Sequence, residues 1–410
     1  MSILTKRRSS KGRVILLTLL AIAVLNVPVF DRAGAQQITQ QQTQRPRRVS
    51  GGTTDQAPAP NSKDEVDEGD VVRVDTQLVS VPAVVTDANG HPLTGLRPEN
   101  FKLVEDGAVQ NITNFGTVDT PFEIALLLDT SGSTREDVAL IRQAANSFIE
   151  ALRTGDRVGI VAFNTDRTTA DSIATVETLS PLTADRQSLR TAIGNLGASN
   201  GTPYYDALER VADEIFREPP RDEVKGRRAV VALTDGVDSA STSDFNSAKL
   251  KLSRAGIACY FIQVNTEDFV EDRLMKDCQD DGRLALSQRQ LQRYRQIFAP
   301  HAKPEDYQNF CQMGQFEKMS ISRDLYSLAR REMNDLALSS GGRSFVATDL
   351  SDARAAFASV AADIGTLYSL GYYPTNKARD GKYRAIQLQV RGLKEKAQIR
   401  ARAGYYAPKQ

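Results

Sequence analysis

The chain of 410 residues contains only two histidines and three cysteines. It also lacks the H-E-x-x-H and G-x-x-x-x-G-K-S/T motifs, which mark zinc proteases and phosphate-binding loops. A serine nucleophile needs a base, and neither His91 nor His301 is a sequence neighbour of Ser131 or Ser133. We therefore expect a protein that is not an enzyme, and we assign no catalytic residue.

Three cysteines are too few for a disulfide scaffold. Cys259 lies in the apolar run 257–262, so we expect an inert thiol in the core. Cys278 and Cys311 lie in one polar segment and could pair in an oxidising compartment. The sequence leaves this open, because a disulfide depends on the separation of the two residues in space.

The N-terminus has the three regions of a secretory signal peptide. Basic residues among the first 13 positions precede the apolar run Val14–Leu25, and Ala33-Gly34-Ala35 supplies a small-residue cleavage site. We predict a signal peptide over residues 1–35, cleavage after Ala35, and a secreted or periplasmic protein. The apolar run is short for a membrane-spanning helix, although an uncleaved anchor stays open as an alternative.

The mature chain has no excess of positive charge. Cleavage would remove six of the 52 basic residues and one of the 51 acidic residues, which leaves a net charge of −4. Such a chain has no general attraction for nucleic acid or for anionic lipid. We expect no nucleic-acid partner and no stable membrane insertion after cleavage.

Composition divides the rest of the chain into four parts. Residues 36–70 are rich in Gln, Thr, Pro and charge, which predicts a disordered linker. Residues 71–120 and 367–408 alternate apolar and polar side chains with period two, as β-strands do. Each of these segments has too few strands to form a stable unit alone. We therefore predict one β-sandwich that is split in the sequence, with residues 121–366 inserted between its halves.

Residues 121–366 alternate apolar runs with helical patterns. The runs predicted as strands are 124–128, 158–163, 229–233, 257–264 and 343–347. Helices are predicted near 135–153, 185–196, 205–217, 245–255, 325–339 and 352–365. This alternation predicts an α/β domain with a doubly wound, mostly parallel sheet. A polar insertion at about 267–323 is either a specificity element or a loop without a binding role.

Oxygen-bearing side chains follow two of these predicted strands. Asp129, Ser131 and Ser133 come directly after run 124–128, and Asp235 follows run 229–233. Thr202 lies in the turn Gly201-Thr202-Pro203 and offers a third hydroxyl. Ligands of doubly wound sheets bind beyond the carboxyl ends of the strands, and oxygen donors suit a hard divalent cation. We predict a site for Mg²⁺, with Mn²⁺ or Ca²⁺ as alternatives.

The order D-x-S-x-S, then T, then D resembles the metal-ion-dependent adhesion site (MIDAS) of von Willebrand factor A (VWA) domains. The resemblance covers roughly residues 120–365, and it implies a VWA fold, which is Rossmann-like. The wider layout is similar to a family of secreted bacterial VWA-related proteins, which share the stretches "VVTDANGHPLTGLRPENFKLVEDG" and "YSLGYYP".

That resemblance also implies roles for the site residues. Ser131, Ser133 and Thr202 would supply hydroxyl oxygens, while Asp129 and Asp235 would hold the ion directly or through water. A coordination position would stay open for an acidic side chain of a protein partner, as in cell adhesion. Asp238, in the same loop as Asp235, is either a group that supports the metal ligands or a solvated loop residue, and we favour the solvated residue.

Two other functions stay open. The ion could stabilise the domain while the β-sandwich serves a structural or assembly role, or the site could act as a metal-dependent hydrolase. The sequence leaves open the identity of the partner and the oligomeric state.

Overall fold

The computed structural model describes residues 78–131, 138–166, 173–268, 270–271, 286, 288–393 and 396–409. The predicted signal peptide and linker, together with Ser133 and Cys278, lie outside these residues. Among the described residues, no helix combines the length and the apolar character that a membrane span requires.

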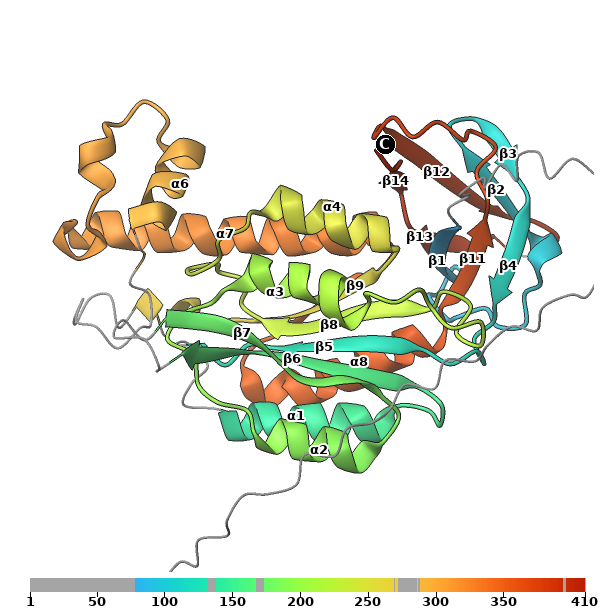
Figure 1. Ribbon diagram of the computed structural model, residues 1–410, viewed down its shortest axis with the longest axis horizontal. Helices are drawn as coiled ribbons and strands as arrows, with labels where there is room; N and C mark the ends of the chain where they lie inside the picture. The colour runs from blue at the N-terminus through green and yellow to red at the C-terminus, as the bar shows by residue number, and fades with distance from the viewer. Residues whose placement is uncertain are drawn as a thin grey trace, which may run out of the picture. The chain divides into compact units, whose positions relative to one another are not determined.

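A six-stranded sheet forms the centre of the α/β region (Figure 1). Its strands, in spatial order, are β10 (Arg343–Ala347), β9 (Ala258–Val264), β8 (Arg228–Thr234), β5 (Glu123–Leu128), β6 (Arg157–Asp166) and β7 (Ile173–Thr183). All neighbours are parallel except β7, which runs antiparallel to β6. Every residue of β5, β8 and β9 is buried, as the near-continuous apolar runs of central parallel strands require.

Helices cover both faces of this sheet (Figure 1). The first face carries α1 (Val138–Ala151), α2 (Arg186–Gly194) and α8 (Ala353–Gly365), which share one apolar core with the strands. The second face carries α3 (Tyr204–Arg210), α4 (Phe245–Ala255), α6 (Gln288–Phe298) and α7 (Gln315–Ser340), around another core. A π-helical turn, η3 (Val211–Ile215), continues α3, and the 3₁₀ turns η4 (Pro304–Tyr307) and η5 (Phe310–Gln312) lie between α6 and α7. The sheet is therefore enclosed between two helical layers.

Strands from both ends of the chain form two further sheets of four strands each. The first sheet has the order β13 (Gln398–Ala401), β1 (Val79–Thr86), β11 (Tyr368–Tyr372), β4 (Ile112–Gly116). The second has the order β14 (Gly404–Tyr406), β12 (Tyr383–Val390), β2 (Phe101–Glu105), β3 (Ala108–Gln110). Their buried side chains share a core that includes Val81, Leu103 and Tyr372. We call these eight strands the β unit.

The predicted α/β class with a doubly wound, mostly parallel sheet is confirmed. Two details of the prediction were wrong. Residues 173–183 form strand β7, which was not predicted, and α7 begins at Gln315 rather than near 325, within the stretch assigned to the insertion. The split β-sandwich and the domain boundaries stay predictions.

The described cysteines differ in state. Cys259 is a free thiol, fully buried in β9, and burial raises its pKa to about 12, which makes it inert. Cys311 is disulfide-bonded. Because Cys278 lies outside the described residues, the predicted pairing stays a prediction.

Candidate metal centre

Asp129 comes directly after β5 and is fully buried. β5 pairs with β8 so that Leu128 lies opposite Leu233, and the Asp129 amide donates to the Leu233 carbonyl oxygen at 3.0 Å. The ends of these two strands therefore lie side by side. This pairing brings the turn after β5 next to Thr234 and Asp235, although more than 100 residues separate them in the sequence.

Hydroxyl and amide donors surround the Asp129 carboxylate. Its Oδ1 accepts from the Ser131 amide at 2.9 Å and from the Ser131 hydroxyl at 2.5 Å. Its Oδ2 accepts from the Thr234 hydroxyl at 2.6 Å. Thr234 also accepts from the Gly236 amide at 2.8 Å, in a turn where Gly236 has φ +74° and a Cβ would meet Met333 at 2.7 Å. The positive φ therefore favours glycine at this turn.

Asp235 is only 5% exposed and has a separate set of contacts. Its Oδ1 accepts from the Val237 amide at 3.0 Å, and its Oδ2 accepts from the Thr266 hydroxyl at 2.7 Å. The Thr266 hydroxyl also lies 2.7 Å from the Tyr326 hydroxyl of α7. Thr266 follows the end of β9, so a third strand end contributes to the site. Burial and the charge of Asp235 raise the pKa of Tyr326, which keeps it a neutral hydroxyl.

The two carboxylates lie close enough to repel each other. Burial, and then the negative charge of Asp235, raise the pKa of Asp129 to about 7, although the Ser131 and Thr234 hydrogen bonds oppose this shift. A buried pair of like charges is unfavourable unless a proton or a cation compensates it. Binding of a proton or a cation at this site would reduce the repulsion.

Thr202 lies in a loop that is hydrogen-bonded to the segments that follow β5 and β8. Its amide donates to the Ser239 hydroxyl at 2.9 Å, and its carbonyl oxygen accepts from the Ser239 amide at 3.0 Å. Within the same loop, the Ser199 amide donates to the Thr130 carbonyl oxygen at 2.9 Å. Thr202 itself is 6% exposed. The structure thus brings Asp129, Ser131 and Asp235 together and places Thr202 on the adjoining loop.

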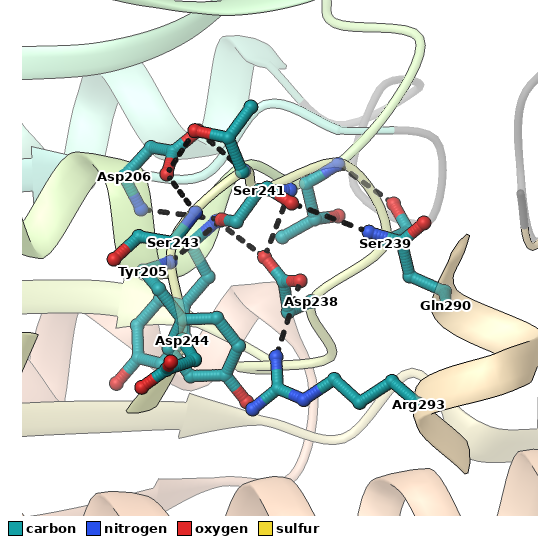
Figure 2. Close-up of polar contacts among 12 residues, drawn as sticks. Tyr205, Asp206, Asp238, Ser239, Ser241, Ser243, Asp244, Gln290 and Arg293 are labelled. Atoms are coloured by element: carbon teal, nitrogen blue, oxygen red, sulfur yellow. Dashed lines mark hydrogen bonds and ion pairs between the residues drawn. The ribbon is translucent and has the colours of Figure 1, made fainter. Parts of the chain in front are cut away.

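Asp238 is buried in this region, so the favoured interpretation of it as a solvated loop residue was wrong. It is 9% exposed, and burial raises its pKa to about 6. Its Oδ1 accepts from the Tyr204 amide at 3.1 Å and from the Ser241 amide at 3.3 Å (Figure 2). Asp238 therefore holds the Asp235 loop against the start of α3, directly after Thr202.

Helix α6 of the insertion contacts the same loop (Figure 2). The Arg293 guanidinium lies 4.0 Å from Asp238 Oδ2 and 4.6 Å from the centre of the Tyr205 ring. Gln290, one helical turn earlier, donates to the Ser241 carbonyl oxygen at 3.5 Å. The insertion is therefore in direct contact with the loop that carries Asp235.

The donors of this region fit a hard cation better than a soft one. The described residues contain no group of three or more His, Cys, Asp or Glu side chains that could hold a metal ion, so a cation here would depend on two carboxylates with hydroxyl oxygens. Carboxylate and hydroxyl oxygens suit Mg²⁺, Mn²⁺ or Ca²⁺ rather than zinc or copper. The raised pKa of Asp129 shows where a positive charge would be stabilised.

This fold and site define a class of protein, namely an α/β domain that carries acidic and hydroxyl side chains beyond its strand ends. More specifically, residues 123–292 match the model of the von Willebrand factor type A domain, and this region has the VWA fold. VWA domains are commonly protein-interaction or adhesion modules, and they generally bind protein partners. No curated protein matches the chain.

Several solved structures are similar to the chain. The protein BatB from Bacteroides thetaiotaomicron is 14% identical, with a TM-score of 0.35, over 59% of this chain and 98% of that one. A von Willebrand factor type A protein from Catenulispora acidiphila is 13% identical, with a TM-score of 0.38, over 82% and 75%. The vWF domain of the type V pili tip protein Mfa5 from Porphyromonas gingivalis is 17% identical, with a TM-score of 0.24, over 29% and 39%.

Proposed function

We propose that the chain is a secreted, metal-ion-dependent protein-binding or adhesion module. Its site would hold Mg²⁺, or Mn²⁺ or Ca²⁺, through the residues Asp129, Ser131, Ser133, Thr202 and Asp235. The observation that supports this most strongly is the close, buried pair of Asp129 and Asp235 among hydroxyl groups.

The chemistry of capture follows from the donor set. Asp129 and Asp235 would neutralise most of the charge of the ion, and the hydroxyl groups would add neutral oxygens. When bound, Mg²⁺ supplies a coordination position at which water can exchange for an oxygen ligand. An acidic side chain of a partner is such a ligand, and the remaining positive charge favours it. The partner would therefore be a protein that presents a Glu or Asp.

Export is the second part of the proposal. Basic residues, an apolar run and the Ala33-Gly34-Ala35 site support cleavage after Ala35 and a secreted or periplasmic location. N-terminal sequencing of the exported protein tests this, because the mature chain would begin at Gln36. A chain that retained Met1 in a membrane fraction would contradict it.

Titration calorimetry with Mg²⁺ tests the metal site. The wild-type protein is expected to bind, and Asp129→Ala is expected to lower the affinity at least about tenfold, because a buried anionic ligand is removed. Asp306→Ala is the matched control, since Asp306 is exposed in η4 of the insertion and makes no contact with the site. Absence of binding by the wild type, or equal binding by Asp129→Ala, would refute the site.

A pull-down of exported proteins with this chain as bait, carried out once in Mg²⁺ and once in EDTA, distinguishes an adhesion role from an assembly role. Metal-bridged capture is expected to disappear both in EDTA and in Asp129→Ala. A partner that is retained under both conditions would favour the structural role, in which the ion only stabilises the domain. Turnover of a phosphate ester that is lost in Asp235→Ala would favour a hydrolase instead.

A further inference from the structure

A cavity lies where the α/β region meets the β unit. It has a volume of about 440 Å³, and its lining includes residues that follow η3, the end of α4, and the strands β1 and β11. Five basic residues line it, and Glu218 is the single acidic residue among them. The basic residues are Arg217, Lys225, Arg228, Arg254 and Arg402. The cavity therefore gathers positive charge in a protein whose overall charge is close to neutral.

Arg402 is a buried cation without an acidic partner. It is 4% exposed, and its guanidinium donates to the carbonyl oxygens of Gly404 at 2.8 Å and of Ser80 at 3.0 Å. It also donates to the carbonyl oxygen of Ser253. No carboxylate of the described residues lies within ion-pair distance of it, and burial lowers its pKa to about 10. Carbonyl oxygens satisfy its hydrogen bonds but leave its charge uncompensated.

Three exposed cations line the same cavity. Among the described residues, Arg217, Lys225 and Arg254 form no ion pair and no side-chain hydrogen bond. Lys225 also has φ +51°, a left-handed conformation that is unfavourable for a lysine and is often retained at functional sites. Arg228 differs, because it pairs with the buried carboxylate of Glu123 at 2.8 Å. Four of the five basic residues are therefore left without a compensating negative charge.

We propose that this cavity binds a small multivalent anion, one that carries a phosphate group or two carboxylates. Like charges that gather around a cavity repel each other, and an anion would relieve this repulsion. Arginine presents several N–H donors to the oxygens of phosphate or carboxylate, so Arg217 and Arg254 suit such a ligand. The volume admits a small organic anion but not a folded partner. The anion site lies apart from the metal centre and does not depend on it.

Calorimetric titration with inorganic phosphate and, separately, with succinate tests the anion site. Both are carried out in EDTA and in about 150 mM salt, which screens nonspecific attraction. The two exposed arginines, Arg217 and Arg254, are replaced in the double variant Arg217→Gln/Arg254→Gln, which should fold normally. The control double variant, Arg354→Gln/Arg379→Gln, removes the same charge at exposed positions outside the cavity.

We expect the wild type and the control to bind at least one of the two anions, and the Arg217→Gln/Arg254→Gln variant to bind it at least about tenfold more weakly. Phosphate alone would indicate a phosphate-bearing ligand, and succinate alone a dicarboxylate. Lack of binding of both anions, or equal affinity in all three proteins, would overturn the proposal. Because Asp129→Ala is expected to keep the anion site, a failure here and a failure of the metal site can be told apart.

Discussion

Asp238 is a carboxyl group whose ionisation opposes folding. Its pKa is about 6 in the folded chain, because burial outweighs the hydrogen bonds and the nearby Arg293 charge, while an unfolded aspartate titrates near 3.9. Between about pH 4 and about pH 6 the folded chain therefore holds more protons at this position than the unfolded chain does. The free energy of unfolding that Asp238 contributes falls as the pH rises through this window and is constant above it.

Replacing Asp238 with asparagine removes this pH dependence. The amide oxygen of Asp238→Asn can still accept from the Tyr204 and Ser241 amides, and the side chain carries no charge at any pH. The difference in unfolding free energy between the variant and the wild type is expected to grow, in favour of the variant, by on the order of 2 kcal/mol as the pH rises from about 4 to about 7. Urea unfolding in EDTA at both pH values measures this difference.

Asp244→Asn is the matched control for the pH experiment. Asp244 caps α4 by accepting from the Ser247 amide at 3.0 Å, and asparagine is as good a cap as aspartate. Its unfolding curves are expected to follow those of the wild type at both pH values. If Asp238→Asn shows the same pH dependence as the wild type, Asp238 is not the buried titrating group that we infer.

The sequence singled out residues that directly follow a predicted strand. Asp129, Ser131 and Asp235 stand at or just after strand ends, and the structure brings them together, while their role as metal ligands stays a prediction. It did not identify Thr234 or Tyr326, because a threonine at the end of a buried strand and a tyrosine on a long helix have ordinary structural roles. Thr266 had a usable signal, since it follows β9 at the same edge of the sheet.

At the scale of elements, helix α6 connects the insertion to the metal centre. Arg293 and Gln290 lie one helical turn apart, so one face of α6 contacts the loop from Asp238 to Ser241. This loop follows Asp235 in the sequence, and its residue Ser239 is hydrogen-bonded to Thr202. The insertion therefore supports the position of two predicted metal ligands without contributing a ligand among its described residues.

Arg293→Gln is expected to lower the affinity for Mg²⁺ by about tenfold. The variant removes the ion pair of the guanidinium with Asp238 and its stacking on the Tyr205 ring, which hold the loop in place. The control is Arg295→Gln on the same helix, whose contacts with Gln292 and Ala302 stay within the insertion. Magnesium titrations measure the affinity, and thermal unfolding in EDTA shows whether each variant is intact. Equal magnesium affinity in the two variants would exclude a positioning role for α6.

Elements with strong apolar periodicity could be predicted, and weaker ones could not. Strands β5, β8 and β9 are continuous apolar runs, and α4 has both an N-cap and a left-handed glycine, Gly256, at its end. β7 was missed because it is a partly exposed edge strand, rich in Thr and containing Pro181. Its pairing with β6 stabilises it, and that contact is not visible in the local sequence.

At the scale of the whole molecule, the β unit depends on both ends of the chain. In the first sheet, β1 lies between β11 and β13, and in the second, β12 lies between β2 and β14. The sequence predicted one β-sandwich shared by both segments, since each half alone had too few strands, and the sandwich stays a prediction. It could not indicate the side-chain bridges to the α/β region, such as that from Arg400 to Asp363 of α8.

A chain that ends at Gly392 tests this dependence. It would lack β13 and β14, the buried Tyr405, and the contacts of Arg400 and Arg402 with the α/β region. We expect the midpoint of thermal unfolding to fall by about 10 °C or more, because several kcal/mol of burial and hydrogen bonding would be lost. The exposed β-unit core should also bind a hydrophobic dye.

A chain that ends at Ala407 is the control, because it keeps both strands and loses only the last three residues. Its unfolding midpoint is expected to stay within about 2 °C of that of the full chain. Should the chain that ends at Gly392 unfold at the same temperature as this control, the C-terminal strands would not be part of the stable fold. Magnesium titration of the chain that ends at Gly392 adds a second comparison. The candidate metal centre lies at the ends of β5 and β8 that are opposite to the β unit (Figure 1). The magnesium affinity should therefore change less than the unfolding midpoint does.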